Sequence, residues 1–171
     1  MKYIKLYEEY NNIDIPNEIA IWFMDFYASQ NIKFLIPNDI PQYIYDNSRK
    51  FIKEYFKSNT LYRGESRDYE ITNPITFSPN NNQGISWTID KYTAMGFIEP
   101  DTVLYDYLYE LNLNKIKYPV SIDYIMNNIT DEQIQMITNP ITKTQMKNYV
   151  SESEVLVFDT ITSNDMKVKL I

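Results

Sequence analysis

The chain has 171 residues, a formal net charge of −7, and neither histidine nor cysteine. This length fits one domain, and the missing residue types exclude zinc sites built on Cys or His as well as Ser-His-Asp and Cys-His catalysis. The negative charge argues against broad electrostatic binding to nucleic acid, which needs a basic face. Acid–base chemistry must then fall to Asp, Glu, Lys or Tyr, and the charge either suits a basic partner or serves solubility alone.

Neither a signal peptide nor a membrane span is expected. The first ten residues mix lysines and glutamates and have no apolar core. The most hydrophobic stretch, residues 19–24, is far shorter than the roughly 20 apolar residues that a membrane span requires. We therefore expect a cytoplasmic protein, acting in its own cell or in the cytosol of a host cell.

The first third of the chain predicts two amphipathic helices. Apolar residues recur at helical spacing from Ile19 to Tyr27, which places them on one face of a helix. A second set runs from Ile44 to Phe56, with lysines and a glutamate on the opposite side. This second helix is expected to end near Ser58 or Asn59.

After residue 59 the apolar pattern changes to a period of two, which is typical of strands. Short strands are expected over residues 60–64 and 85–88. Thr88 and Asp90 can cap a helix that runs to about Phe97. The sequence therefore predicts a strand–turn–helix unit in the middle of the chain.

The second half predicts further strands and one short helix. The clearest alternation of apolar and polar residues covers 103–113. The segment Thr130-Asp131-Glu132-Gln133 is a capping box that opens a short helix. The apolar stretch 154–158 and the alternating stretch 166–171 predict the last strands.

Together these elements predict one α+β domain over residues 1–171, because helices come first and strands later. Residues 1–59 form its helical N-terminal part, and residues 60–171 form its β-rich part. No linker, repeat or low-complexity block separates the two.

Glu152 and Glu154 stand two residues apart where a strand is expected to begin. In an extended chain such residues face the same way, so both carboxylates would enter one site. Like charges at close range raise one pKa, which would let one carboxylate stay ionised while the other exchanges protons. The alternative is a solvated edge where a loop becomes a strand.

Arg63 lies within an apolar strand and is followed by Gly64. An arginine in this place suits bidentate recognition of a phosphate or carboxylate. Gly64 would let a ligand approach the backbone closely. The alternative for Arg63 is a structural salt bridge to Glu65 or Glu70.

Ser86-Trp87-Thr88 places two hydroxyl groups on one face of a short strand. Ser86 could hold a carboxylate in position by hydrogen bonding. Trp87, on the other face, would belong to the core. The alternative is an ordinary strand whose exposed face carries Ser and Thr.

In this order, Leu61-Tyr62-Arg63-Gly64, Ser86-Trp87-Thr88 and Glu152-Ser153-Glu154 resemble the Arg–Ser–Glu class of mono-ADP-ribosyltransferases. That family has an arginine on its first core strand, a Ser-x-Ser/Thr strand, and a Glu-x-Glu or Gln-x-Glu entering a later strand. The Ser-Trp-Thr followed by a helix is similar to a variant common in bacteriophage and bacterial members. The resemblance spans about residues 60–171 and implies a split β-sandwich core preceded by N-terminal helices.

The resemblance also implies a role for each residue. Arg63 would bind a phosphate of NAD⁺, and the backbone of Gly64 would meet the nicotinamide amide. Ser86 would orient Glu154, which would bond the nicotinamide ribose and stabilise positive charge as nicotinamide leaves. Glu152 would activate the acceptor, since Glu-x-Glu usually accompanies arginine acceptors.

Other residues of these segments follow from the same resemblance. Trp87 and Thr88 would complete the NAD⁺-binding strand. Tyr92, Phe97 and Tyr105 are unranked candidates for an aromatic ring that stacks on nicotinamide. The segment before the glutamates, residues 138–150, would select the protein target.

The expected function is transfer of ADP-ribose from NAD⁺ to a protein side chain, arginine first, with no metal. The likeness to phage and toxin proteins suggests a target in transcription or translation machinery with a basic surface, and no direct contact with nucleic acid or membrane. NAD⁺ glycohydrolase activity from the same site is one alternative. A catalytically silent partner-binding domain of this fold, or a chance match in an unrelated α+β binding module, are the others.

Overall fold

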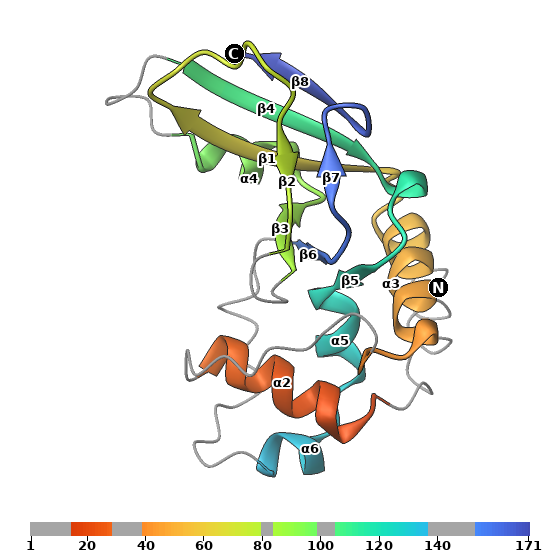
Figure 1. Ribbon diagram of the computed structural model, residues 1–171. Helices are drawn as coiled ribbons and strands as arrows, with labels where there is room; N and C mark the ends of the chain where they lie inside the picture. Colours follow the sequence, from red (N-terminus) through yellow and green to blue (C-terminus); the bar gives the residue numbers. More distant parts are fainter. Residues whose placement is uncertain (1–14, 29–38, 80–83, 99–104, 137–152) are drawn as a thin grey trace.

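A six-stranded sheet and a set of short helices make up the protein in the computed structural model, which describes residues 15–28, 39–79, 84–98, 105–136 and 153–171 (Figure 1). The sheet has the strand order β5-β6-β3-β1-β4-β8, and a second, two-stranded sheet joins β2 to β7. Every pairing within them is antiparallel. The fold is therefore α+β, as the sequence predicts.

The strands are β1 (Thr60–Arg67), β2 (Thr76–Phe77), β3 (Ile85–Thr88), β4 (Tyr105–Asn112), β5 (Pro119–Ser121), β6 (Glu154–Val157), β7 (Ile161–Thr162) and β8 (Met166–Leu170). The helices are α2 (Asn17–Ala28), α3 (Gln42–Tyr55), α4 (Lys91–Gly96), α5 (Ile122–Asn128), α6 (Asp131–Gln135) and the 3₁₀ helix η2 (Leu113–Lys115). None of the described helices is long and apolar enough to cross a membrane.

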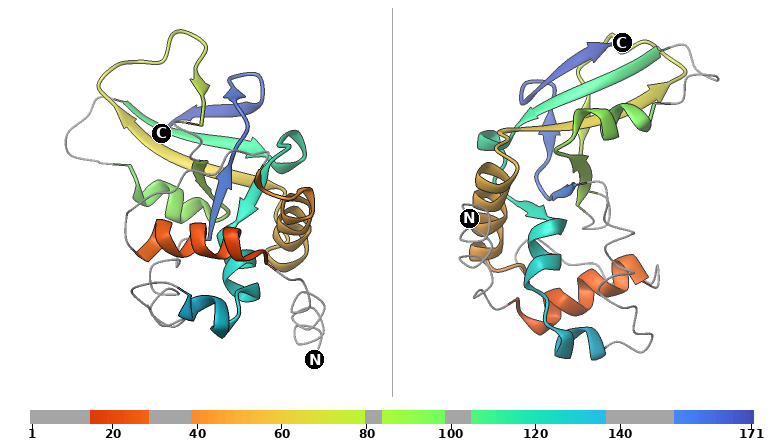
Figure 2. Two further views of the ribbon diagram at one scale, coloured as in Figure 1. Left: turned by 60° about the horizontal axis from the view of Figure 1, so that its bottom comes forward. Right: turned by 180° about the vertical axis from the view of Figure 1, so that it is seen from behind.

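The large sheet consists of two halves with little strand pairing between them. β1 pairs with β4 along its whole length, and β3 pairs with β6 at all four of its residues. Within the described part of the chain, β1 and β3 share one paired position, Tyr62 opposite Thr88. The β1-β4-β8 half and the β3-β6-β5 half thus meet at one corner and diverge beyond it (Figures 1 and 2).

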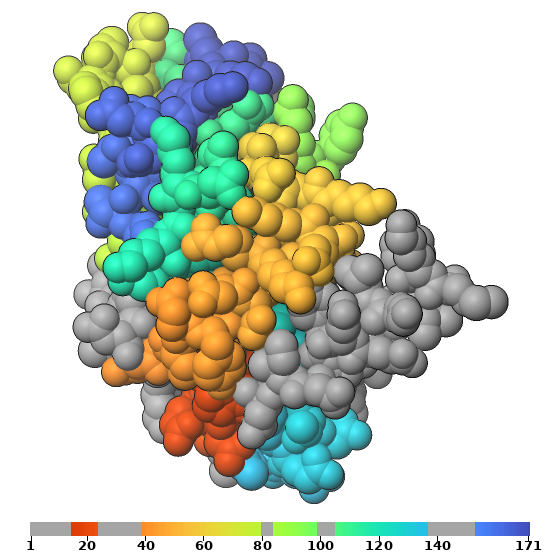
Figure 3. All heavy atoms as spheres, turned by 90° about the vertical axis from the view of Figure 1, so that its right-hand side faces the viewer, coloured from red at the N-terminus to blue at the C-terminus, as the bar shows by residue number. Residues whose placement is uncertain are grey.

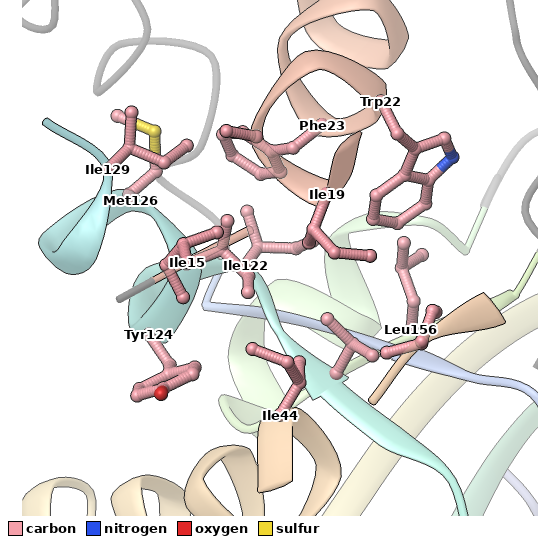
Figure 4. Close-up of a cluster of buried hydrophobic side chains, with 14 of the residues drawn as sticks. Ile15, Ile19, Trp22, Phe23, Ile44, Ile122, Tyr124, Met126, Ile129 and Leu156 are labelled. Carbon is pink, nitrogen blue, oxygen red and sulfur yellow. The ribbon is translucent and has the colours of Figure 1, made fainter. Parts of the chain in front are cut away.

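One hydrophobic core lies between the helices and the β5-β6 end of the sheet. Side chains of α2, α3 and α5 meet Leu156 of β6 there, as the close-up in Figure 4 shows. α5 comes from the β-rich part of the sequence yet packs with the N-terminal helices. The helical layer is therefore built from both parts of the chain, and α3 lies between α2 and the strands (Figure 3).

A second core lies between the large sheet and the small β2–β7 sheet. The Phe77 ring of β2 packs edge-on against Trp87 and Tyr109, with ring centroids 5.9 Å and 5.0 Å apart. Both rings are buried, so the small sheet closes one face of the large one. The N-terminal helices and α5 cover the other face around Leu156.

Most predicted elements are present, with shifted ends. The helix predicted to reach Ser58 ends at Tyr55, and Lys57 has a positive φ of 52°, a conformation that cannot continue a right-handed helix. β1 runs three residues past the predicted Gly64, and α6 begins with the predicted capping box at Thr130.

The sequence did not predict β5 and α5. The segment from Tyr118 to Ile129 is nearly all buried, so it shows neither a strand nor a helix alternation. The Ser121 side chain accepts a hydrogen bond from the backbone N–H of Tyr124 and caps α5.

Candidate functional site

A cavity of about 340 Å³ lies where β1 and β3 diverge. Its lining comes from β1, β3, α4 with the residue after it, and the first residue of β6: Tyr62, Arg63, Gly64, Glu65, Ser86, Trp87, Thr88, Ala94, Phe97 and Glu154. The three segments that stand out in the sequence thus line one cavity.

Arg63 spans the gap between the two halves of the sheet. Its Nη1 donates a hydrogen bond of 2.8 Å to the backbone carbonyl of Ser86, and its guanidinium lies 5.4 Å from the centre of the Phe77 ring. Its Nε is buried without a hydrogen-bond partner among the described residues. The sequence left open a salt bridge between Arg63 and Glu65, but in the structure Glu65 pairs with Arg67 at 3.0 Å.

The register places Arg63 and Glu154 on opposite faces of the sheet. Tyr62, Thr88 and Glu154 are mutually paired and therefore point to one side. Arg63 follows Tyr62 and leaves β1 on the other side. Both reach one cavity because it lies in the gap between the strands.

Ser86 and Thr88 share a face of β3, as predicted. Ser86 is exposed, and Thr88 is buried beneath the turn into α4. The Thr88 hydroxyl accepts a hydrogen bond of 3.1 Å from the backbone N–H of Asp90. Asp90 in turn accepts from the backbone N–H groups of Tyr92 and Thr93, so it is the N-cap of α4.

Glu154 opens β6 opposite Thr88 and is half-buried. Because Ser86 is paired with Leu156, Ser86 and Glu154 are diagonal neighbours on one face, roughly 7 Å apart between Cα atoms. At that spacing a serine hydroxyl and a glutamate carboxylate can interact.

Ser153 has an unusual backbone, with a φ of 49° in the left-handed region. Its carbonyl accepts a hydrogen bond of 3.2 Å from the backbone N–H of Ile89, which ties the start of β6 to the end of β3. The chain is therefore not extended at Ser153. Glu152 itself lies outside the described residues.

Gly64 meets a helix at its Cα. A Cβ built on Gly64 would lie 1.9 Å from the backbone oxygen of Ala94 in α4. The sequence suggested that this glycine admits a ligand to the backbone. In the structure the absence of a side chain at Gly64 allows α4 to pack directly on β1 (Figure 2).

Trp87 lines the cavity but is only 1% exposed, and its ring packs against Phe77 in the core. This matches its expected place on the core face. We therefore assign Trp87 to the support of the cavity wall.

The structure ranks the three candidate aromatic residues. Phe97 lines the cavity and is 54% exposed. Tyr92 is 81% exposed and outside the lining, and Tyr105 packs against the second core. Of these three candidates, Phe97 is therefore the one whose ring is available to a ligand in this cavity.

Two lining residues, Tyr62 and Glu65, were missed in the sequence. For Glu65 the sequence did contain an indication, because this residue is two positions from Arg63 and therefore lies on the same face of β1. Its Oε2 accepts hydrogen bonds from Arg67 at 3.0 Å and from the Tyr109 hydroxyl at 3.1 Å. Burial, followed by the charge of Glu65, raises the pKa of Tyr109, so that hydroxyl remains a donor at neutral pH.

The cavity thus combines one guanidinium, two carboxylates and several hydroxyl groups with aromatic rings. In the described ranges, no group of three Asp or Glu residues is placed to hold a metal ion. Comparison of the chain with protein-family models, curated proteins and solved structures finds no match.

Proposed function

We propose that this protein is an NAD⁺-dependent mono-ADP-ribosyltransferase that modifies a protein side chain, arginine first. The observation that carries the proposal is the convergence of Arg63, Ser86 and Glu154, from three distant segments, on one cavity. A chance match of three short motifs gives no reason for them to meet.

The chemistry of the cavity suits cleavage of the bond between nicotinamide and ribose. That cleavage develops positive charge at the anomeric carbon, and a fixed carboxylate nearby stabilises it, as in glycosidases. Glu154 provides this carboxylate, on a strand end that its pairing with Thr88 holds in place. Ser86 lies diagonally beside it and orients it.

Arg63 provides the positive charge for the diphosphate. One of its five N–H groups is bonded to the Ser86 carbonyl, which fixes the guanidinium at the gap between the strands. A fixed guanidinium matches the oxygen atoms of a phosphate.

The sheet supports the finer assignment of an ADP-ribosyltransferase-like split β-sandwich. Its two halves meet at one position and open a cavity between them. N-terminal helices pack against one end of it, as in the family that the sequence resembles.

The test is incubation of the purified protein with labelled NAD⁺ and a cell lysate, beside its Glu154→Gln variant. The matched control is Glu70→Gln, which changes an exposed glutamate outside the cavity. We expect a labelled protein band with the wild type and the control, and loss of at least about 100-fold in the Glu154 variant.

Each other outcome has a distinct meaning. Release of free nicotinamide and ADP-ribose without a labelled protein shows a glycohydrolase that uses the same residues. Neither signal, together with no binding of NAD⁺, refutes the proposal and leaves a partner-binding domain. The acidic net charge of −7 leads us to propose a target with a basic surface.

A further inference from the structure

We infer that Glu65 binds the 2′,3′-diol of the adenosine ribose and excludes a 2′-phosphate, so that the cavity takes NAD⁺ and rejects NADP⁺. This inference rests on the function proposed above. It assigns a role to a residue that the sequence motifs left out.

The charged groups of the cavity follow one another along the direction of β1. Tyr62 lies in one row with Thr88 and Glu154, and Glu65 is three residues further along β1. Three residues of strand span about 10 Å. Along the direction of β1, the row that contains Glu154 therefore comes first, then Arg63, and then Glu65, which leaves β1 on the same face as Arg63.

A dinucleotide has the same order of groups, which is ribose, diphosphate, ribose. With Glu154 at the nicotinamide ribose and Arg63 at the diphosphate, the second ribose falls at the Glu65 end. A carboxylate in that position can accept hydrogen bonds from both hydroxyl groups of a ribose, as acidic residues do in other dinucleotide-binding proteins.

Glu65 is held in a fixed orientation. Its Oε2 accepts from both Arg67 and the fully buried Tyr109, from its own strand and from β4. Its Oε1 makes no further hydrogen bond with the described residues, and the side chain is 29% exposed. A carboxylate fixed in this way is preorganised to accept a hydrogen bond from a ligand.

The same charge acts against a 2′-phosphate. A phosphate at this ribose would meet the Glu65 carboxylate, and like charges in a partly desolvated site repel strongly. Glu65 also neutralises Arg67, which would otherwise attract the phosphate. Removing the charge of Glu65 should therefore both weaken NAD⁺ binding and improve NADP⁺ binding.

The experiment measures dissociation constants of NAD⁺ and NADP⁺ by calorimetry for four proteins: wild type, Glu65→Gln, Tyr109→Phe and the control Glu70→Gln. We expect the wild type and control to prefer NAD⁺ by about 100-fold or more. In Glu65→Gln, NAD⁺ should bind roughly 10-fold more weakly and the preference should largely disappear. Tyr109→Phe keeps the charge but loosens the carboxylate, so NAD⁺ should weaken while NADP⁺ stays excluded.

The wild type alone provides a test that needs no variant to fold. Equal affinity for NAD⁺ and NADP⁺ in the wild type overturns the inference about Glu65. So does a preference for NAD⁺ that is unchanged in Glu65→Gln, although the proposed function then stands. No binding of NAD⁺ by the wild type overturns the inference together with the proposed function.

Discussion

Ser153 shows how a single backbone torsion sets the direction of a side chain. Left-handed backbone in a residue other than glycine costs about 1 kcal/mol or more, and it persists where the surroundings determine it. Here the hydrogen bond from Ile89 to the Ser153 carbonyl holds the turn, and Glu154 follows at once in β6. Ser153 is therefore a positioning residue for Glu154.

This role predicts different results for two substitutions at the same position. Ser153→Gly should keep the fold and the activity, because glycine adopts a positive φ without strain. Ser153→Val should lower the free energy of unfolding by roughly 1–3 kcal/mol and reduce nicotinamide release, because a β-branched residue resists this conformation. Urea unfolding and a nicotinamide assay check both, and equal behaviour of the two variants would contradict the assigned role.

Substitution of Glu154 and of Glu152 should have different effects on hydrolysis and on transfer. Glu154→Gln is expected to abolish both hydrolysis of NAD⁺ and transfer to protein, since both need the developing charge stabilised. Glu152→Gln should reduce transfer more than hydrolysis, because its proposed part is activation of the acceptor, typically worth ~10²–10⁴-fold. Rates of nicotinamide release and of protein labelling test this, and an equal loss of both rates in the two variants would argue against Glu152.

At the level of elements, α4 is fixed at one end by a cap and along one side by a close backbone contact. Asp90 caps its first turn, and hydrogen bonds from the Thr93 hydroxyl and then from the backbone N–H of Tyr92 lower the pKa of Asp90. Gly64 lets the carbonyl of Ala94 rest against β1. The position of Phe97 at the cavity follows from both.

Gly64→Ala should therefore displace α4. The added Cβ would lie 1.9 Å from the Ala94 oxygen, so helix and strand must move apart, at a cost of about 1–3 kcal/mol in the free energy of unfolding. Gly96→Ala is the matched control, because nothing lies within 4 Å of its added Cβ. Denaturant unfolding of both proteins makes the comparison, and an equal change in both would show that α4 does not pack on β1 this way.

Elements with a local signal were predictable, and those without one were not. The cap at Asp90 and the capping box at Thr130 depend on neighbours in sequence, and both predictions are confirmed. β5 and α5 have no such signal, because burial on all sides removes the alternation of polar and apolar residues. The left-handed Ser153 was also missed, since serine gives no sign of a positive φ.

The candidate site was predictable in its residues but not in its form. The motifs name Arg63, Ser86 and Glu154, and all three line the cavity. The gap between β1 and β3 depends on where pairing stops, and residues far apart in sequence determine that. Glu65 could have been expected from its place two residues after Arg63 in β1, but its hydrogen bond from Tyr109 of β4 depends on a residue far away in the sequence.

For the whole molecule, Asp123 predicts how stability changes with pH. Burial raises its pKa from 3.8 to about 6, and its Oδ2 has no hydrogen-bond partner among the described residues. The folded state therefore holds this proton more tightly than the unfolded state, and the stability so gained is lost as pH rises through about 6. The loss accumulates between pH 3.8 and about 6, and above that range the buried charge destabilises the fold by a constant amount.

Asp123→Asn, which removes the charge at nearly equal size, should therefore stabilise the protein at pH 7 by roughly 1–3 kcal/mol. The advantage should shrink as pH falls below 6 and nearly vanish near pH 4. Thermal unfolding of both proteins across this range measures it. A constant difference between them at every pH would show that Asp123 is not the titrating group.

The corner at Tyr62 and Thr88 has a consequence for hydrogen exchange. Backbone groups of β1 that face β3 beyond this corner lie outside its strand pairing, so the halves of the sheet can open independently. A ligand that binds to both sides of the gap would couple the opening motions of the two halves. Amide protons in β4 and in β5, which contribute no residue to the cavity lining, should then exchange more slowly together when NAD⁺ is added, so protection at a distance would report occupancy of the cavity.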